Sequence, residues 1–142
     1  MPLIKTKRLA SGLMLKRYRL PYTELVAAAT TQTISLCTLP TDAVVHNVSV
    51  DLLTDFADAG SITNITLQVG SSGDPNSFFT ALEVLASSPA NQRYEQKGVW
   101  EAGDGLAVKC LATATGANFG DGTDSDVDAG AADIDIIYSV AE

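Results

Sequence analysis

Residues 43–53, AVVHNVSVDLL, decide the fold, because their apolar and polar side chains alternate with a period of two. In an extended strand, this alternation puts Val44, His46, Val48, Val50 and Leu52 on one face and Val45, Asn47, Ser49 and Asp51 on the other. The pattern predicts a β-strand with one face on a core. It also places the only histidine, His46, on the inward face, where a core or interface role is expected rather than catalysis.

Three further stretches show the same alternation, at residues 64–69, 106–112 and 133–140. Weaker strand candidates lie at residues 15–22, 32–39 and 92–100, and residues 75–88 fit either a short helix or a strand. Turn-forming clusters of Gly, Pro, Asp and Ser separate these segments. Seven or eight short strands at this spacing predict an all-β protein, an antiparallel two-sheet β-sandwich of jelly-roll type.

The charges are distributed very unevenly along the 142 residues. The first twenty residues contain six of the nine bases and no acid, whereas residues 21–142 contain three bases and 17 acids, a formal charge of −14. We therefore expect an extended basic N-terminal arm over residues 1–14 and a single sandwich domain over residues 15–142. The six bases are the candidate docking residues toward an acidic partner or a neighbouring copy: Lys5, Lys7, Arg8, Lys16, Arg17 and Arg19.

Composition and charge argue against several classes of function. A body of charge −14 opposes phosphate, so nucleic acid is not an expected partner. No apolar run is long enough to span a bilayer, and the bases at 16, 17 and 19 interrupt any secretory signal. Cys37 and Cys110 form neither a disulfide framework nor a metal motif, which is typical of a protein made in a reducing cytoplasm.

No pattern of residues indicates catalysis. The sequence contains no nucleophile elbow, phosphate-binding loop or dinucleotide fingerprint, and neither cysteine has a basic neighbour in sequence that would activate it. A non-enzymatic protein without a cofactor is expected.

An acidic stretch, residues 121–135, gives a weak metal candidate. Asp124, Asp126, Asp128 and Asp135 approach the spacing of a calcium loop, whose carboxylates at positions 1, 3, 5 and 12 surround the ion. The turn glycine comes one place late, at Gly130, and position 12 is the short Asp135 rather than glutamate. The alternative is a solvated acidic loop between two strands.

Two long segments carry a family resemblance. Residues 39–79, LPTDAVVHNVSVDLLTDFADAGSITNITLQVGSSGDPNSFF, and residues 103–139, GDGLAVKCLATATGANFGDGTDSDVDAGAADIDIIYS, resemble small structural proteins of tailed bacteriophages in texture and in order. This resemblance covers about residues 35–140 and includes no catalytic motif, so it transfers no functional residue.

The resemblance implies a β-sandwich component of the virion. It implies a capsid decoration (cement) protein on the capsid surface, with the major capsid protein or other virion proteins as partners and several copies together, a trimer being favoured. Synthesis would be in the cytoplasm of the bacterial host. The alternative is a head-fibre, neck or tail-associated binding module that recognises a receptor or a carbohydrate. Its binding would depend on calcium if the acidic stretch of residues 121–135 holds the ion.

Overall fold

The computed structural model describes residues 4–9, 12–40, 42–57, 60–71, 77–85, 92–101 and 107–140, with the backbone alone at residues 4, 5, 92 and 96–101. Its elements are nine strands and one short 3-10 helix: β1 (Ile4–Arg8), β2 (Met14–Pro21), η1 (Tyr22–Glu24), β3 (Thr31–Thr38), β4 (Ala43–Ala57), β5 (Asn64–Ser71), β6 (Phe79–Glu83), β7 (Gln92–Glu101), β8 (Ala107–Thr115) and β9 (Ala129–Val140). The predicted all-β class is confirmed.

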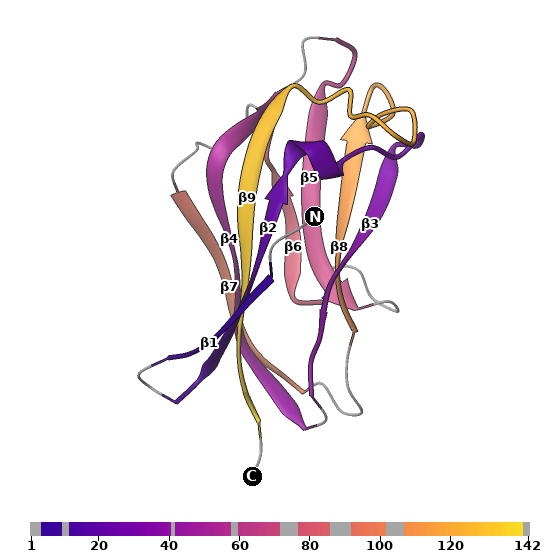
Figure 1. The fold of residues 1–142 in the computed structure, drawn as a ribbon. Helices are drawn as coiled ribbons and strands as arrows, with labels where there is room; N and C mark the ends of the chain where they lie inside the picture. The colour runs from indigo at the N-terminus through magenta and orange to yellow at the C-terminus, as the bar shows by residue number, and fades with distance from the viewer. Residues whose placement is uncertain are drawn as a thin grey trace.

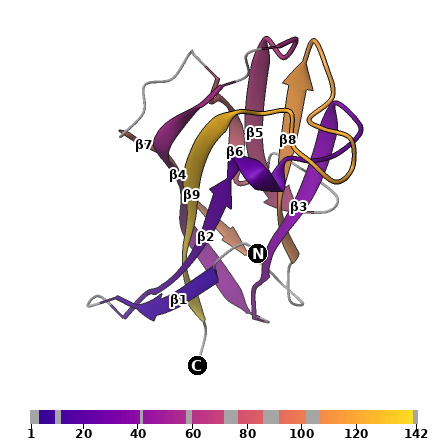
Figure 2. The ribbon, with the colours of Figure 1, turned by 45° about the horizontal axis from the view of Figure 1, so that its top comes forward.

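Two antiparallel sheets pack face to face, as Figures 1 and 2 show. The strand order is β1-β2-β9-β4-β7 in the first sheet and β3-β8-β5-β6 in the second. From β2 onward, every connection crosses between the sheets except the β5–β6 hairpin. This is the topology of an eight-stranded jelly roll, with β1 added at one edge.

The core lies between the sheets and is built by the alternation seen in the sequence. Val48, Val50 and Leu52 of β4 face Ile134 and Ile136 of β9 from neighbouring strands, and all five are at most 1% exposed. Each such side chain contributes about 1.5–3 kcal/mol when it is fully buried. The second sheet adds its own inward row, which includes Ile65, Leu67, Val108 and Cys110.

A β-bulge in β4 overturns one detail of the sequence analysis. The register of β4 with both its neighbours shifts between Val45 and Asn47, so the side chains before and after the shift exchange faces. Val45 is consequently fully buried, whereas Val44 and His46 are only half-buried. The expectation that His46 lies among the inward valines was therefore wrong.

Two further segments form strands in the structure: one that fitted either a helix or a strand, and one within the expected N-terminal arm. Residues 79–83, which fitted either a helix or a strand, form the edge strand β6. Residues 4–8, within the arm expected over residues 1–14, form β1, and all five pair with β2 from Ile4 opposite Tyr18 to Arg8 opposite Met14. Figure 1 shows this hairpin projecting from one end of the sandwich.

Candidate functional site

The outward face of the five-stranded sheet carries two adjacent cross-strand rows of charged side chains. One row runs across β2, β9, β4 and β7 as Arg19, Asp133, Asp51 and Arg93. The next row runs across β2, β9, β4 and β7 as Arg17, Asp135, the uncharged Ser49 and Glu95, and the backbone of Lys5 in β1 pairs opposite Arg17. In the first row, acids on the two central strands thus lie between bases on the flanking strands, an arrangement that stabilises cross-strand neighbours.

Two of the predicted docking residues bind acids of their own chain. Arg17 donates to both carboxylate oxygens of Asp135, from Nε at 2.7 Å and from Nη2 at 2.8 Å. Arg19 donates to both carboxylate oxygens of Asp133 in the same way, with 3.0 Å between Arg19 Nη2 and Asp133 Oδ2. Paired, charge-assisted hydrogen bonds of this kind are among the strongest available to a side chain.

Arg93 closes the network from the opposite side. Its Nη1 lies 3.1 Å from Asp51 Oδ2 and 3.2 Å from Asp135 Oδ2, and its Nε donates to Glu95 at 3.0 Å. Asp135 and Asp133 are consequently 1% and 4% exposed although they lie on the outer face of the sheet. The guanidinium groups cover them, so the network forms a lid of side chains over β9.

The electrostatics follow from this geometry. The hydrogen bond to Asp135 raises the pKa of Arg17, and the bond to Asp133 raises that of Arg19. Burial raises the pKa of Asp51, although Arg93 opposes this shift by stabilising the carboxylate. Arg17 and Arg19 therefore stay cationic and remain attached to the body.

The other candidate docking residues lie toward the projecting end of the hairpin. Lys7 and Arg8 are exposed on β1, and Lys16 is half-buried on β2, while Lys5 is described only by its backbone in β1. Within the described part of the chain, neither Lys7 nor Arg8 forms an ion pair. A hollow of about 410 Å³ beside them is lined by Thr6, Lys7, Leu15 and Arg17.

The acidic loop, defined here as residues 116–128, lies between β8 and β9. Asp124, Asp126 and Asp128 are exposed on it, whereas Asp135 lies within β9 and is held by Arg17. Among the described residues, no group of three or more His, Cys, Asp or Glu side chains could hold a metal ion. The structure therefore does not bring the four calcium candidates together.

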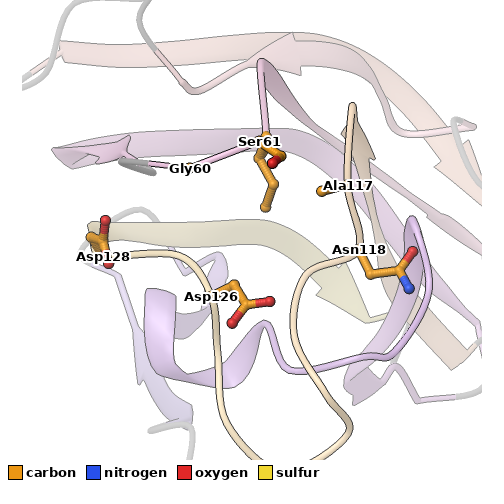
Figure 3. A pocket seen from close by; sticks show the side chains of 7 residues that line it. Gly60, Ser61, Ala117, Asn118, Asp126 and Asp128 are labelled. Atoms are coloured by element: carbon orange, nitrogen blue, oxygen red, sulfur yellow. The ribbon is translucent and has the colours of Figure 1, made fainter.

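A second hollow, of about 450 Å³, opens beside this loop. Figure 3 shows Ser61 and Ala117 on one side of it and Asp126 and Asp128 on the other. Its described lining carries carboxylate, amide and hydroxyl groups but no aromatic side chain. It therefore offers acceptors for a cationic group rather than a stacking surface.

The residues considered for catalysis are placed for structural roles. His46 Nε2 lies 2.8 Å from the hydroxyl of Ser139, across β4 and β9. Cys37 and Cys110 are free thiols, and burial raises the pKa of Cys37 and takes that of Cys110 to about 12. A thiol that stays protonated is a poor nucleophile.

Sequence reasoning missed the partners of the basic segment. Asp51, Asp133 and Asp135 are outward residues of their strands, and period two alone identifies Asp133 and Asp135 as polar positions in a strand. Nothing local shows that β9 pairs with β2, because more than a hundred residues separate Arg17 from Asp135. Arg93 could not be recognised as a partner either, because it lies 42 positions along the chain from Asp51 and from Asp135.

Comparison with known proteins identifies the fold. No model of a protein family matches the chain, and no curated protein matches it. Among solved structures, a chain of the cyanophage Pam1 capsid asymmetric unit has a TM-score of 0.62 and 19% identity, and the match covers 91% of this chain and 85% of that one.

Two further capsid structures give the same result. A chain of the Helicobacter pylori bacteriophage KHP30 capsid has a TM-score of 0.59 at 19% identity, over 97% of this chain and 92% of that one. A chain of the Ralstonia phage GP4 capsid has a TM-score of 0.59 at 21% identity, over 99% and 92%. At these identities the likeness defines a shared jelly-roll fold.

Within the described residues, none of the helical structure is long and apolar enough to cross a bilayer.

Proposed function

We propose that this chain is a structural protein of a tailed-bacteriophage virion, and specifically a capsid decoration (cement) protein that docks on the head shell and multimerises there. The observation that carries the proposal is the fold match over at least 85% of the length of chains in three phage capsid structures. The proposed location is the capsid surface, and the proposed partner is the major capsid protein or another virion protein.

The described side chains support a structural role. The inward residues of both sheets are committed to the core, and the outward acids of β9 are committed to Arg17, Arg19 and Arg93. His46 lies 2.8 Å from Ser139 across two paired strands, and burial keeps the two cysteine thiols protonated, which suits packing rather than chemistry. A body of this kind supplies a stable, ligand-free unit that can be repeated over a shell.

Docking is proposed to use the basic hairpin, defined as β1, β2 and the turn between them. Lys7 and Arg8 are its exposed cations, with Lys5 and Lys16 close by in the register. Arg17 and Arg19 contribute by position rather than as free charges, because their guanidinium groups bind Asp135 and Asp133. Such a surface steers binding toward an acidic partner and makes the association sensitive to salt.

The test uses particles of a phage that encodes the chain, prepared without it, and measures co-sedimentation of the purified protein. Saturable binding to heads, together with a higher temperature of particle rupture, is the expected result. The variant K7Q/R8Q should bind more weakly, whereas K109E, which lowers the net charge by the same amount on the other sheet, should bind like the wild type. Binding to isolated tails and not to heads would favour the alternative role in the tail; binding to neither would contradict a virion role.

A further inference from the structure

Two surfaces of opposite charge lie at opposite ends of the molecule. Met14, at the start of β2 and opposite Arg8, pairs with Tyr138 near the end of β9, whereas the acidic loop directly precedes Ala129 at its beginning. Tyr138 lies nine positions after Ala129 along the strand, a span of about 30 Å. Figures 1 and 2 show the hairpin and this loop at different ends of the sandwich. The two surfaces of one copy therefore cannot meet each other.

The acidic loop is held in a fixed shape. Phe119 and Val127 are 0% and 2% exposed and anchor it in the core. Three backbone N–H groups of the loop donate to the segment before β3: Phe119 to Ala29, Gly120 to Ala27 and Gly122 to Val26. The carboxylate of Asp121 accepts the N–H groups of Thr123 and Asp124. The loop thus presents its carboxylates without having to be ordered first.

The carboxylates at the loop are available to a partner. Asp124 and Asp126 are exposed, and in the described part of the chain neither forms an ion pair. Asp126 also lines the hollow of about 450 Å³, which can receive a long cationic side chain. At the other end, the hollow of about 410 Å³ between Lys7, Leu15 and Arg17 can receive an acidic one. Each surface therefore combines a recess with the charge opposite to that of the other surface.

We propose that the basic hairpin of one copy binds the acidic loop of a second copy, head to tail. The occupant of the acidic hollow is then Lys7 or Arg8 of the neighbour, and the neighbour's hairpin hollow receives a carboxylate of the loop. A contact between two different surfaces repeats from copy to copy, so it closes into a ring or continues as an open row. This contact would join the copies in the multimer of the proposed function. It rests on that function only for its location on a capsid shell.

The test needs the purified protein alone and measures its association by sedimentation velocity. At about 20 mM NaCl the average mass should rise with protein concentration, and at about 500 mM NaCl it should fall toward one chain. K7Q/R8Q and D124N/D126N should each weaken the association, raising its dissociation constant by about tenfold, which is the effect of losing two exposed ion pairs. Their controls, K109E and E83K, change the net charge equally but lie away from both surfaces, and they should associate like the wild type.

Charge reversal separates this contact from any other mode. K7E/R8E and D124K/D126K should each be monomeric alone, and their equimolar mixture should associate, because each supplies the surface that complements the other. A mixture that stays monomeric, or a K7E/R8E protein that associates like the wild type, overturns the head-to-tail contact. Since no particle is present, either result leaves the binding to heads as a separate measurement, and loss of binding to heads leaves this contact standing.

Discussion

At the scale of single residues, the most consequential side chain is Asp135. Its carboxylate is 1% exposed and accepts two hydrogen bonds from Arg17 and one from Arg93, which offset the cost of removing the charge from water. Arg17 and Arg93 are each more than a third exposed, so water screens part of this attraction. The carboxylate therefore depends on the arginines more than the arginines depend on it.

Replacing Asp135 with asparagine should destabilise the fold by about 2 kcal/mol, below the 3–5 kcal/mol typical of a fully buried pair because the arginines can turn to water. Urea unfolding followed by circular dichroism measures the change. The matched control is D124N in the acidic loop, where the carboxylate is exposed and the effect should stay within about 0.5 kcal/mol. Equal stabilities of D135N and D124N would contradict a structural role for the network.

Cys110 predicts how the stability depends on alkaline pH. Burial raises its pKa from 9.0 to about 12, so between these values the unfolded chain loses a proton that the folded chain keeps. The free energy of unfolding must therefore fall as the pH rises, and ionisation of this thiol in the unfolded chain accounts for a loss of about 2 kcal/mol at pH 10.5. The variant C110A removes that loss, while burial, the largest cause of the raised pKa of Tyr18 and Tyr138, remains in both proteins.

The measurement is the free energy of unfolding at pH 8 and pH 10.5 for both proteins, in the presence of a reductant. The wild type should lose about 2 kcal/mol more than C110A between the two pH values. Identical pH profiles would show that the thiol ionises freely and that the centre of β8 is open to solvent.

Gly130 combines a backbone constraint with a packing constraint. Its φ of 139° is one that side chains rarely adopt, and a Cβ there would overlap the ring of Phe56, which is 1% exposed. G130A should cost more than 2 kcal/mol, because the ring and the start of β9 must both move. The control is G122A, with a φ of 95° and open space around the new Cβ, which should cost about 1 kcal/mol in thermal unfolding. A smaller loss for G130A than for G122A would contradict this assignment.

At the scale of elements, the hairpin divides into two strands of different importance. β1 pairs with β2 alone, whereas β2 also pairs with β9 over eight residues and brings Tyr18 and Leu20 into the core. The basic segment that reads as continuous in the sequence is therefore half an edge strand and half an integral part of the sheet.

Removing residues 1–9 should leave a cooperatively folded eight-stranded sandwich, with a loss of about 1–2 kcal/mol from the unpaired edge. Removing residues 1–20 takes away most of β2, with the burial of Tyr18 and Leu20 and the partners of Asp133 and Asp135, and should abolish the fold. Urea unfolding and amide NMR spectra distinguish the two cases. A chain of residues 21–142 that unfolds cooperatively would show that β2 is dispensable.

The elements themselves could be predicted because alternation is local. The period of two at residues 64–69, 106–112 and 133–140 identified β5, β8 and β9, and alternate outward positions placed Asp133 and Asp135 on a polar face. Two things are not local. The bulge near His46 reverses the faces of β4 without any glycine to mark it, and the register that brings Arg17 to Asp135 is set by the jelly-roll topology. The candidate docking residues could therefore be named from the sequence, but their intramolecular partners could not.

At the scale of the whole molecule, the acidic body carries charges of two kinds that respond differently to salt. The acids on β9 and β4 are in contact with arginines and largely covered, so added ions screen those attractions little. The exposed acids of the loop and of the strand ends repel one another through solvent, where screening is strong. With a net charge of −8, repulsion is the term that salt can change most.

Raising NaCl from about 20 mM to 500 mM should therefore stabilise the folded chain, by about 1 kcal/mol, because unfolding relieves a repulsion that salt has already weakened. The measurement is urea unfolding at a protein concentration at which sedimentation shows one chain, so that association does not contribute. In D124N/D126N two of the repelling charges are absent, and the gain from salt should be smaller. In D135N the exposed charges are unchanged, so its gain should equal that of the wild type. A loss of stability with salt would mean that the arginine network is exposed to screening and that it, rather than the core, is the main support of the five-stranded sheet.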